Sequence, residues 1–258
     1  MDKTTIPGIF FGIGMILLGQ KLEGGHAGSL LQLTAFMIVV GGTIGAVLVS
    51  YPLGEVIGGI KGLKMALQEK PSDVVQLITQ LVELATIARR DGVLALEGKL
   101  AEVKDPFLKR ALGFLVDGVE ASVARGTLET EIEIEAEEQN VTAKFWGDFG
   151  ALCPTVGVLG AVLGLIHVME NLDNPAALGP GIAVAFVATV YGVGVANLIA
   201  LPLSNKIKRK VSIEKERKTL IAEGVLAIQE GLNPRILEEK LKSFGGHHAK
   251  HMKSGDKK

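Results

Sequence analysis

Four stretches of this sequence contain no Asp, Glu, Lys or Arg and are rich in apolar residues. They are residues 4–20, 30–53, 149–169 and 180–203. A helix needs about 20 mostly apolar residues to cross the bilayer core, and ionised side chains are costly there. The pattern therefore predicts an all-α membrane protein with four transmembrane helices.

The first stretch is short and rich in glycine, which raises the alternative of a signal peptide. Its only preceding basic residue, Lys3, is opposed by Asp2, and no A-x-A cleavage site follows. Signal peptides begin with a positively charged region and end at such a site. We therefore predict that the first helix is retained.

The basic residues indicate the orientation. Of the 27 Lys and Arg, one precedes the first stretch and one lies in the short loop after it, while all others lie in the long polar block and the tail. Cytoplasmic loops carry such an excess, so the block, the tail and both termini are expected in the cytoplasm. The expected organisation is two transmembrane helices in 1–53, a cytoplasmic domain in 54–147, helices three and four in 148–203 and a tail in 204–258. The net charge of −1 gives no reason to expect nucleic acid.

The cytoplasmic block has helical patterns throughout. Ser72 and Asp73 are N-cap candidates before a helical run of apolar residues, and Asp105 followed by Pro106 marks the start of another helix. The segment TLETEIEIEAEEQ at 127–139 alternates like a strand, but nothing offers it a partner strand, and we interpret it as a helix with a solvated acidic face. The last residues, 243–258, are polar and expected to be disordered.

Motifs of enzymes are missing. The glycine pairs at 12–14 and 192–194 lie inside apolar stretches without the strand and acidic residue of a dinucleotide site. The single cysteine, Cys153, is interpreted as a small packing residue. We therefore expect no enzyme activity, no cofactor and no metal site.

Small residues recur at helical spacing in the apolar stretches, including Gly157, Gly160, Ala161 and Gly164 in the third. Small side chains let helices approach closely in a membrane, so we expect a tightly packed bundle and an oligomer. Apart from His167, near the outer end of the third stretch, the polar groups at depth are hydroxyls and amides. Since no Asp, Glu, Lys or Arg is present, any ion carrier must be a carboxylate of another protein.

The third stretch reads CPTVGVLGAVLGLIHVM, the fourth AFVATVYGVGVANLIALPL, and the N-terminal part GGHAGSLLQLTAFMIVVGGTIGAVL. With two spans before the polar block and two after it, this pattern resembles the flagellar stator subunits of the MotA/TolQ/ExbB family. The resemblance implies a ring of this chain in the cell inner membrane, thought to have five copies, around the paired transmembrane helices of a MotB partner. MotB would supply the missing aspartate, and ion flow would be converted into torque on the flagellar rotor.

The resemblance also implies an ion pathway. Positions matching Pro154 and Pro202 couple ion passage to conformational change in the family, and Thr155 follows the first of them. A proline removes a helix hydrogen bond and permits a bend, although a plain structural kink is the alternative. Thr189 matches a threonine beside the partner aspartate, unless it only bonds its own helix backbone. Ala161 offers no oxygen ligand where sodium-driven relatives have threonine, which favours protons.

A second implied site is the segment ARRDGVLALEGKL, which resembles the family segment that binds the rotor protein FliG. The spacing of its charged pair selects Arg89 and Glu97, with Arg90 as the alternative register. On a continuous helix the pair would lie about 12 Å apart along the axis. Without the resemblance, a solvated charged face would be the ordinary interpretation.

One departure concerns an acid that many members have about three residues before the first proline. This chain has Ala151 there and Asp148 three residues earlier, and Asp148 is a candidate for the same role at the cytoplasmic mouth. The alternative function is an ExbB/TolQ-type energiser of envelope transport, which usually has one span before the block. A secondary transporter fits less well, because no charge or inverted repeat is found in the spans.

Overall fold

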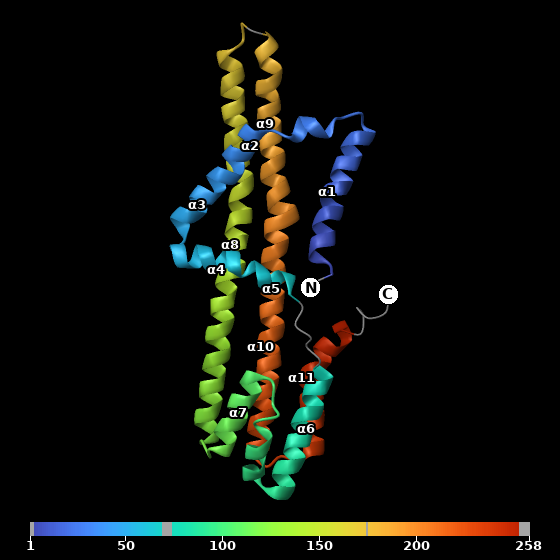
Figure 1. Ribbon diagram of the computed structural model, residues 1–258, viewed down its shortest axis with the longest axis vertical. Coiled ribbons are helices and arrows are strands. Elements are labelled where there is room, and N and C mark those ends of the chain that lie inside the picture. The colour runs from blue at the N-terminus through green and yellow to red at the C-terminus, as the bar shows by residue number, and fades with distance from the viewer. Residues whose placement is uncertain (1–2, 69–73, 174, 253–258) are drawn as a thin grey trace. The chain divides into compact units, whose positions relative to one another are not determined.

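The computed structural model describes residues 3–68, 74–173 and 175–252, and all regular elements in these ranges are helices (Figure 1). The all-α prediction is confirmed. The elements in chain order are α1 (Thr5–Leu22), η1 (Ala27–Leu30), α2 (Leu33–Phe36), η2 (Met37–Gly41), α3 (Gly42–Ser50), α4 (Leu53–Lys61), α5 (Leu63–Leu67), α6 (Val74–Asp91), η3 (Val93–Lys99), α7 (Pro106–Val116), α8 (Ala121–Glu170), α9 (Pro175–Val195), η4 (Ala196–Ala200), α10 (Leu201–Gln229) and α11 (Pro234–Met252).

The chain divides into two compact units. We call residues 1–69 and 138–210 the membrane unit, and residues 70–137 and 211–258 the polar unit. Two of the three boundaries between the units fall inside long helices, α8 and α10, so each of these helices contributes to both units.

Four helices in the described ranges are long and apolar enough to cross a membrane. They are Thr5–Leu22, Leu33–Ser50, Ala121–Glu170 and Leu178–Gln229. Each contains most or all of one of the charge-free stretches, so the prediction of four membrane helices is confirmed. The second and fourth each include one π-helical segment, η2 and η4, which hydropathy did not indicate.

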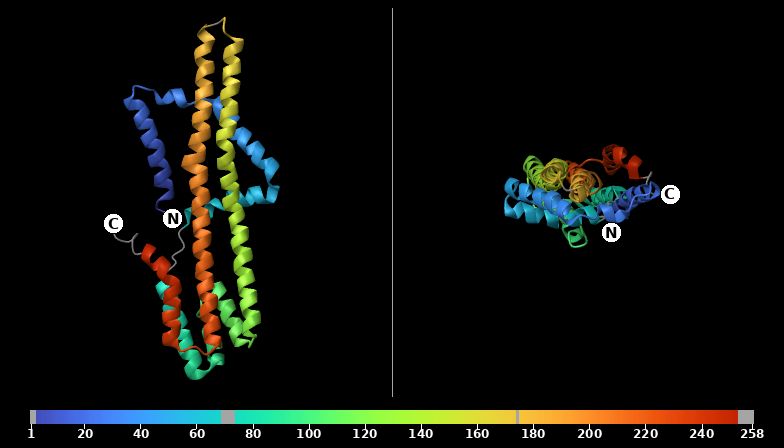
Figure 2. Two further views of the ribbon diagram at one scale, coloured as in Figure 1. Left: turned by 180° about the vertical axis from the view of Figure 1, so that it is seen from behind. Right: turned by 90° about the horizontal axis from the view of Figure 1, so that it is seen from above.

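Within the membrane unit, α8 and α9 lie side by side (Figure 2), and glycines set their separation. A Cβ added at Gly157 would lie 3.0 Å from the carbonyl oxygen of Ala188, and one at Gly164 would lie 2.8 Å from the Ala185 nitrogen. A Cβ at Gly192 would lie 2.7 Å from the carbonyl oxygen of Cys153. The two backbones are therefore in direct contact, as the small residues predicted.

The polar unit is built around one hydrophobic core. Helices α6, α7, α8, α10 and α11, with the short η3, contribute buried residues to it. Seven side chains in this core are fully buried leucines: Leu81, Leu96, Leu108, Leu112, Leu128, Leu237 and Leu241. The apolar face predicted for 74–85 supplies the α6 side of this core, because its leucines recur at helical spacing.

The sequence signals for helix ends have mixed outcomes. Asp105 caps α7 as predicted, since its side chain accepts hydrogen bonds from the N–H groups of Phe107 and Leu108. The predicted caps Ser72 and Asp73 lie outside the described residues. Residues 243–252 were expected to be disordered but form the end of α11, since a helix once begun gains a hydrogen bond for each residue added. Residues 253–258 are not among the described residues.

The glutamate-rich segment at 127–139 is helical, as predicted, and belongs to α8. Its interpretation as a solvated acidic face was wrong for part of the segment. Glu131 pairs with Arg110 of α7 at 2.8 Å, Glu133 pairs with Lys215 of α10 at 2.7 Å, and Glu135 pairs with Lys218. The acidic run therefore joins α8 to two other helices of the polar unit.

Candidate ion path and rotor-binding surface

Pro154 lies inside α8 and does not end the helix, which continues without a break from Ala121 to Glu170. Proline has no N–H, so the carbonyl of Gly150 loses the donor that an ordinary residue at position 154 would supply. The Cα of Pro154 would lie 3.2 Å from a Cβ added at Gly192 of α9. The proline is therefore packed against the backbone of the neighbouring span.

The hydroxyls of the predicted ion path bond to their own helices. Thr155 is exposed and donates to the carbonyl of Leu152 at 2.7 Å. Thr189 is half-buried and donates to the carbonyl of Ala185 at 3.3 Å, which is the alternative foreseen for this residue. At that distance the Thr189 bond is long for a hydroxyl donor, so little is lost if the hydroxyl turns to another acceptor.

Ala161 is half-buried in α8, four residues after Gly157, which contacts α9. Gly160 contacts Ala188, the residue before Thr189. The structure thus brings the α8 positions and Thr189 to one helix pair.

Pro202 lies elsewhere in the membrane unit, exposed at the start of α10 and directly after the π-helical η4. Proline at this position deprives the carbonyl of Leu198 of its usual donor. In a π-helical turn the hydrogen bond reaches one residue further along the chain than in an α-helix. The proline thus follows directly on a segment that already departs from the α-helical hydrogen-bond pattern. Sequence periodicity carries no signal for this turn.

Two further polar contacts in the membrane unit were not predicted. The hydroxyl of Tyr191 donates to the carbonyl of Leu30 at 2.5 Å and accepts from the N–H of Gln32 at 3.3 Å, which fastens the loop before α2 to α9. Asp148, the candidate for the cytoplasmic mouth, accepts a hydrogen bond from the Tyr51 hydroxyl at 2.5 Å. An isolated tyrosine and aspartate gave no indication of this pairing, because the partners are far apart in sequence.

The candidate rotor-binding segment is not one helix. Helix α6 ends at Asp91, Gly92 has a φ of 87°, and η3 begins at Val93. The positive φ of Gly92 ends the helical path, so the axial separation calculated for a continuous helix does not apply to Arg89 and Glu97. Both side chains are exposed, and Arg89 precedes this turn in the sequence while Glu97 follows it.

Arg90, the alternative register, is held by its neighbour. Its guanidinium donates two hydrogen bonds to Asp91, at 2.8 and 2.7 Å, and this contact lowers the pKa of the Asp91 carboxyl. Arg89 has no resolved ion pair among the described residues. A partner would therefore compete with Asp91 for Arg90 but not for Arg89.

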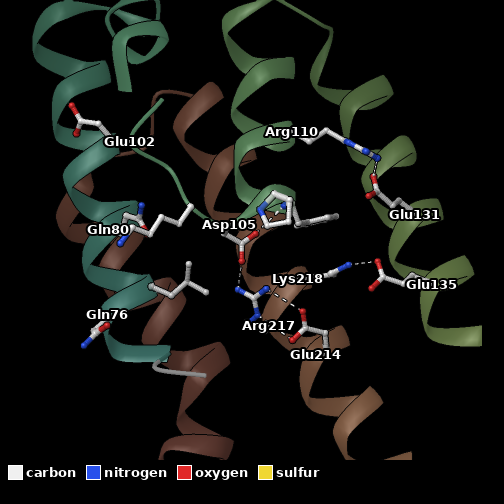
Figure 3. A pocket seen from close by; sticks show the side chains of 14 residues that line it. Gln76, Gln80, Glu102, Asp105, Arg110, Glu131, Glu135, Glu214, Arg217 and Lys218 are labelled. Carbon is white, nitrogen blue, oxygen red and sulfur yellow. Dashed lines mark hydrogen bonds and ion pairs between the residues drawn. The ribbon is translucent and has the colours of Figure 1, made fainter. Parts of the chain in front are cut away.

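A cleft of about 820 Å³ in the polar unit holds a group of ion pairs (Figure 3). Arg217 of α10 donates to Asp105 at 2.6 Å and also contacts Glu214. Burial alone would raise the pKa of the Asp105 carboxyl, but hydrogen bonds from the Leu108 N–H and from Arg217 outweigh it and lower the pKa. Three cations that line the cleft, Arg110, Arg217 and Lys218, are each paired with a carboxylate.

Fold and site together define a multi-pass helical membrane protein whose charge-free stretches carry hydroxyls and helix-embedded prolines but no Asp, Glu, Lys or Arg. Residues 99–219 match the MotA/TolQ/ExbB proton channel family, and residues 6–92 match the family described as Motility protein A N-terminal. The chain is 36% identical to Motility protein A of Helicobacter pylori and 34% identical to chemotaxis protein PomA of Vibrio alginolyticus, in both cases over 95% of each chain.

The fold is also similar to a solved structure. The structure described as C. jejuni MotAB superimposes with a TM-score of 0.89 at 37% identity, over 95% of this chain and 96% of that one. The chain belongs to the MotA/TolQ/ExbB proton channel family. Its full-length similarity places it among the motility proteins of that family.

Proposed function

We propose that this chain is the ring-forming subunit of a flagellar stator, which conducts ions across the inner membrane and converts their flow into torque. The observation that carries the proposal is the lack of any Asp, Glu, Lys or Arg in the four charge-free stretches, in a chain that belongs to a proton channel family. Moving a charge through the membrane potential requires a carrier, so a second protein must supply it. The similar C. jejuni structure is described as MotAB, which supports a MotB partner with an aspartate in its membrane helix.

The ion path runs past Pro154, Thr155, Ala161 and Thr189, and Pro202 permits the fourth span to bend. Thr189 is suited to donate a hydrogen bond to a partner carboxyl, because its hydroxyl makes only a long hydrogen bond to the carbonyl of Ala185 and can exchange it for another. Ala161 offers no oxygen at its level, so the conducted ion is the proton rather than sodium. Five copies surround the MotB helices, and both termini face the cytoplasm.

The rotor contact is made by Arg89 and Glu97, with Arg90 as a secondary member, and the partner is the rotor protein FliG. The exposure of Arg89 and Glu97, one before and one after the turn at Gly92, supports this proposal. An ExbB/TolQ-type energiser is disfavoured, because two membrane-capable helices precede the polar block.

The test is complementation of a strain deleted for this gene. We expect intact but paralysed filaments, swimming restored by the wild-type gene, and impaired swimming with Thr189→Ala or Arg89→Glu at equal membrane levels. A protonophore should stop the restored cells, whereas replacing sodium by potassium should not. Normal swimming of the deletion strain, in the absence of a second stator gene, would refute the proposal. Dependence on sodium would refute only the choice of ion.

A further inference from the structure

Two consecutive cations of α10 hold the first turn of α7 in the polar unit (Figure 3). Arg217 binds the Asp105 carboxylate at 2.6 Å, and the ammonium of Lys218 lies 5.0 Å from the centre of the Phe107 ring. Lys218 is also paired with Glu135 of α8. We call Arg217 and Lys218 the α10 clamp.

The Asp105 carboxylate accepts hydrogen bonds both from the first turn of α7 and from Arg217 of α10. One oxygen accepts from the N–H groups of Phe107 and Leu108, both at 2.9 Å, and so caps α7. The other oxygen accepts from Arg217. The side chains of Arg217 and Asp105 are only 19% and 21% exposed, and charge-assisted hydrogen bonds are stronger than neutral ones. The start of α7 is therefore fixed to α10.

Lys218 adds a second point of attachment. The residue is 8% exposed, which is rare for lysine, and its stem and ammonium cover the Phe107 ring. Its ion pair with Glu135 keeps the buried charge compensated. Phe107 is itself 3% exposed in the core, so the clamp holds both the cap residue and the first buried residue of α7.

The first turn of α7 shares a buried core with η3, the segment that carries Glu97 of the candidate rotor-binding surface. Phe107, Leu108 and Leu96 of η3 belong to the same buried cluster, and Leu96 precedes the exposed Glu97. Helix α10 is part of the continuous helix Leu178–Gln229, which contains the fourth span and the Thr189 position. The chain therefore runs from the Thr189 position to Arg217 through the successive helical elements α9, η4 and α10, with no loop between them.

We propose that the α10 clamp positions η3, and with it Glu97, relative to α10, so that movement of the fourth span is delivered to the rotor contact. This inference rests on the proposed stator function. Arg217 and Lys218 are positioning residues, since neither lies on the rotor-binding surface. Paired buried charges add little net stability compared with apolar replacements, so their main contribution here is to fix where α7 begins.

The first measurement is hydrogen–deuterium exchange on the purified complex of the full chain with its MotB partner. Arg217→Gln is expected to raise exchange in residues 93–104 by about five-fold, because these residues lose their anchor, while α6 is unchanged. The matched control is Arg110→Gln, which removes an ion pair to Glu131 in the same unit but does not touch Asp105. It should leave residues 93–104 unchanged.

The second measurement is the torque per stator unit in single motors, with units counted by a fluorescent tag. Arg217→Gln and Lys218→Met should each lower torque at high load to about half or less without changing the number of units or the speed near zero load. Arg217→Lys should give an intermediate torque, because lysine keeps the charge but not the fork that reaches Asp105 and Glu214 together.

Fewer bound units with normal torque per unit would show that the clamp only supports folding and would overturn the inference. Normal exchange and normal torque in Arg217→Gln would overturn it as well. If the wild-type gene itself failed to restore rotation, the proposed function would fail first, and the inference with it. Restoration by the wild type with normal torque in the variants would refute the inference alone.

Discussion

The contact between the α8 and α9 backbones can be tested with two glycines of α9 that lie close together in sequence. A Cβ added at Gly192 would lie 2.7 Å from the Cys153 carbonyl oxygen, 3.1 Å from the Gly157 Cα and 3.2 Å from the Pro154 Cα. All three are backbone atoms, which cannot turn aside as a flexible side chain can. A Cβ added at Gly194 would meet nothing within 4 Å.

The cost of Gly192→Ala follows from this geometry. Ordinary contact begins at 3.4 Å, so the two helices must separate by 0.7 Å, the difference between 3.4 and 2.7 Å. Overpacking of this kind typically costs about 1–3 kcal/mol. Both substitutions gain about 0.5–1 kcal/mol in helix propensity, so that gain cancels when the two variants are compared. Gly194→Ala should therefore be more stable than Gly192→Ala by about 1–3 kcal/mol.

The assay is thermal unfolding of the two purified variants in one detergent, followed by circular dichroism. A difference of 1 kcal/mol corresponds to about 2–4 °C in Tm for a chain of this size. The separation should be visible on that scale, with Gly194→Ala at or above the wild type. Equal Tm values for the two variants would refute the inference that the backbones touch at Gly192.

Three further predictions concern other parts of the molecule. Asp105→Asn should lower the free energy of unfolding of the polar unit by about 1–3 kcal/mol at pH 7. The folded pKa of Asp105 is lowered, so its charge stabilises the fold above the ordinary pKa of 3.8, and this stabilisation is lost as the pH falls through the folded pKa. The difference in free energy of unfolding between wild type and variant, measured in urea, should therefore shrink on acidification. A difference that does not depend on pH would contradict this. Leu81→Ala, at a fully buried site, should lower the free energy of unfolding by about 2–5 kcal/mol. Leu94→Ala, at a site that is 73% exposed, should change it by less than about 0.5 kcal/mol. Similar losses in the two variants would mean that the core is assigned wrongly. In a Cys153→Ser background, an impermeant maleimide added to whole cells should label Gly24→Cys and Asp173→Cys but not Lys208→Cys. If the first two variants were not labelled, the proposed topology would be contradicted.

Much of the fold could be predicted from the sequence, because its strongest signals are local. Charge-free apolar stretches indicate membrane helices whatever surrounds them, and Asp105 followed by Pro106 indicates a helix start on its own. The small residues at 157–164 also gave a correct expectation of close packing. The break at Gly92 was predictable from the sequence, since Asp-Gly pairs mark turns.

The parts that could not be predicted depend on partners distant in sequence or on changes in helix register. Glu135 and Lys218 are 83 residues apart, and nothing local tells whether a glutamate meets water or a lysine. The turn η4 differs from an α-helix by one hydrogen-bond step, which leaves hydropathy unchanged. The roles of Pro154, Thr189 and Arg89 stay predictions, because they depend on other proteins.

The backbone contact at Gly157 and Gly192 limits how the membrane helices can move. Where two helices touch along their backbones, no flexible side chain lies between them that could turn aside when one helix moves toward the other. Helices α8 and α9 therefore form a single mechanical link near Pro154, and a bend at this proline must carry α9 with it. Relative motion within the span pair is left to regions beyond this contact, such as the wide turn η4 just before Pro202.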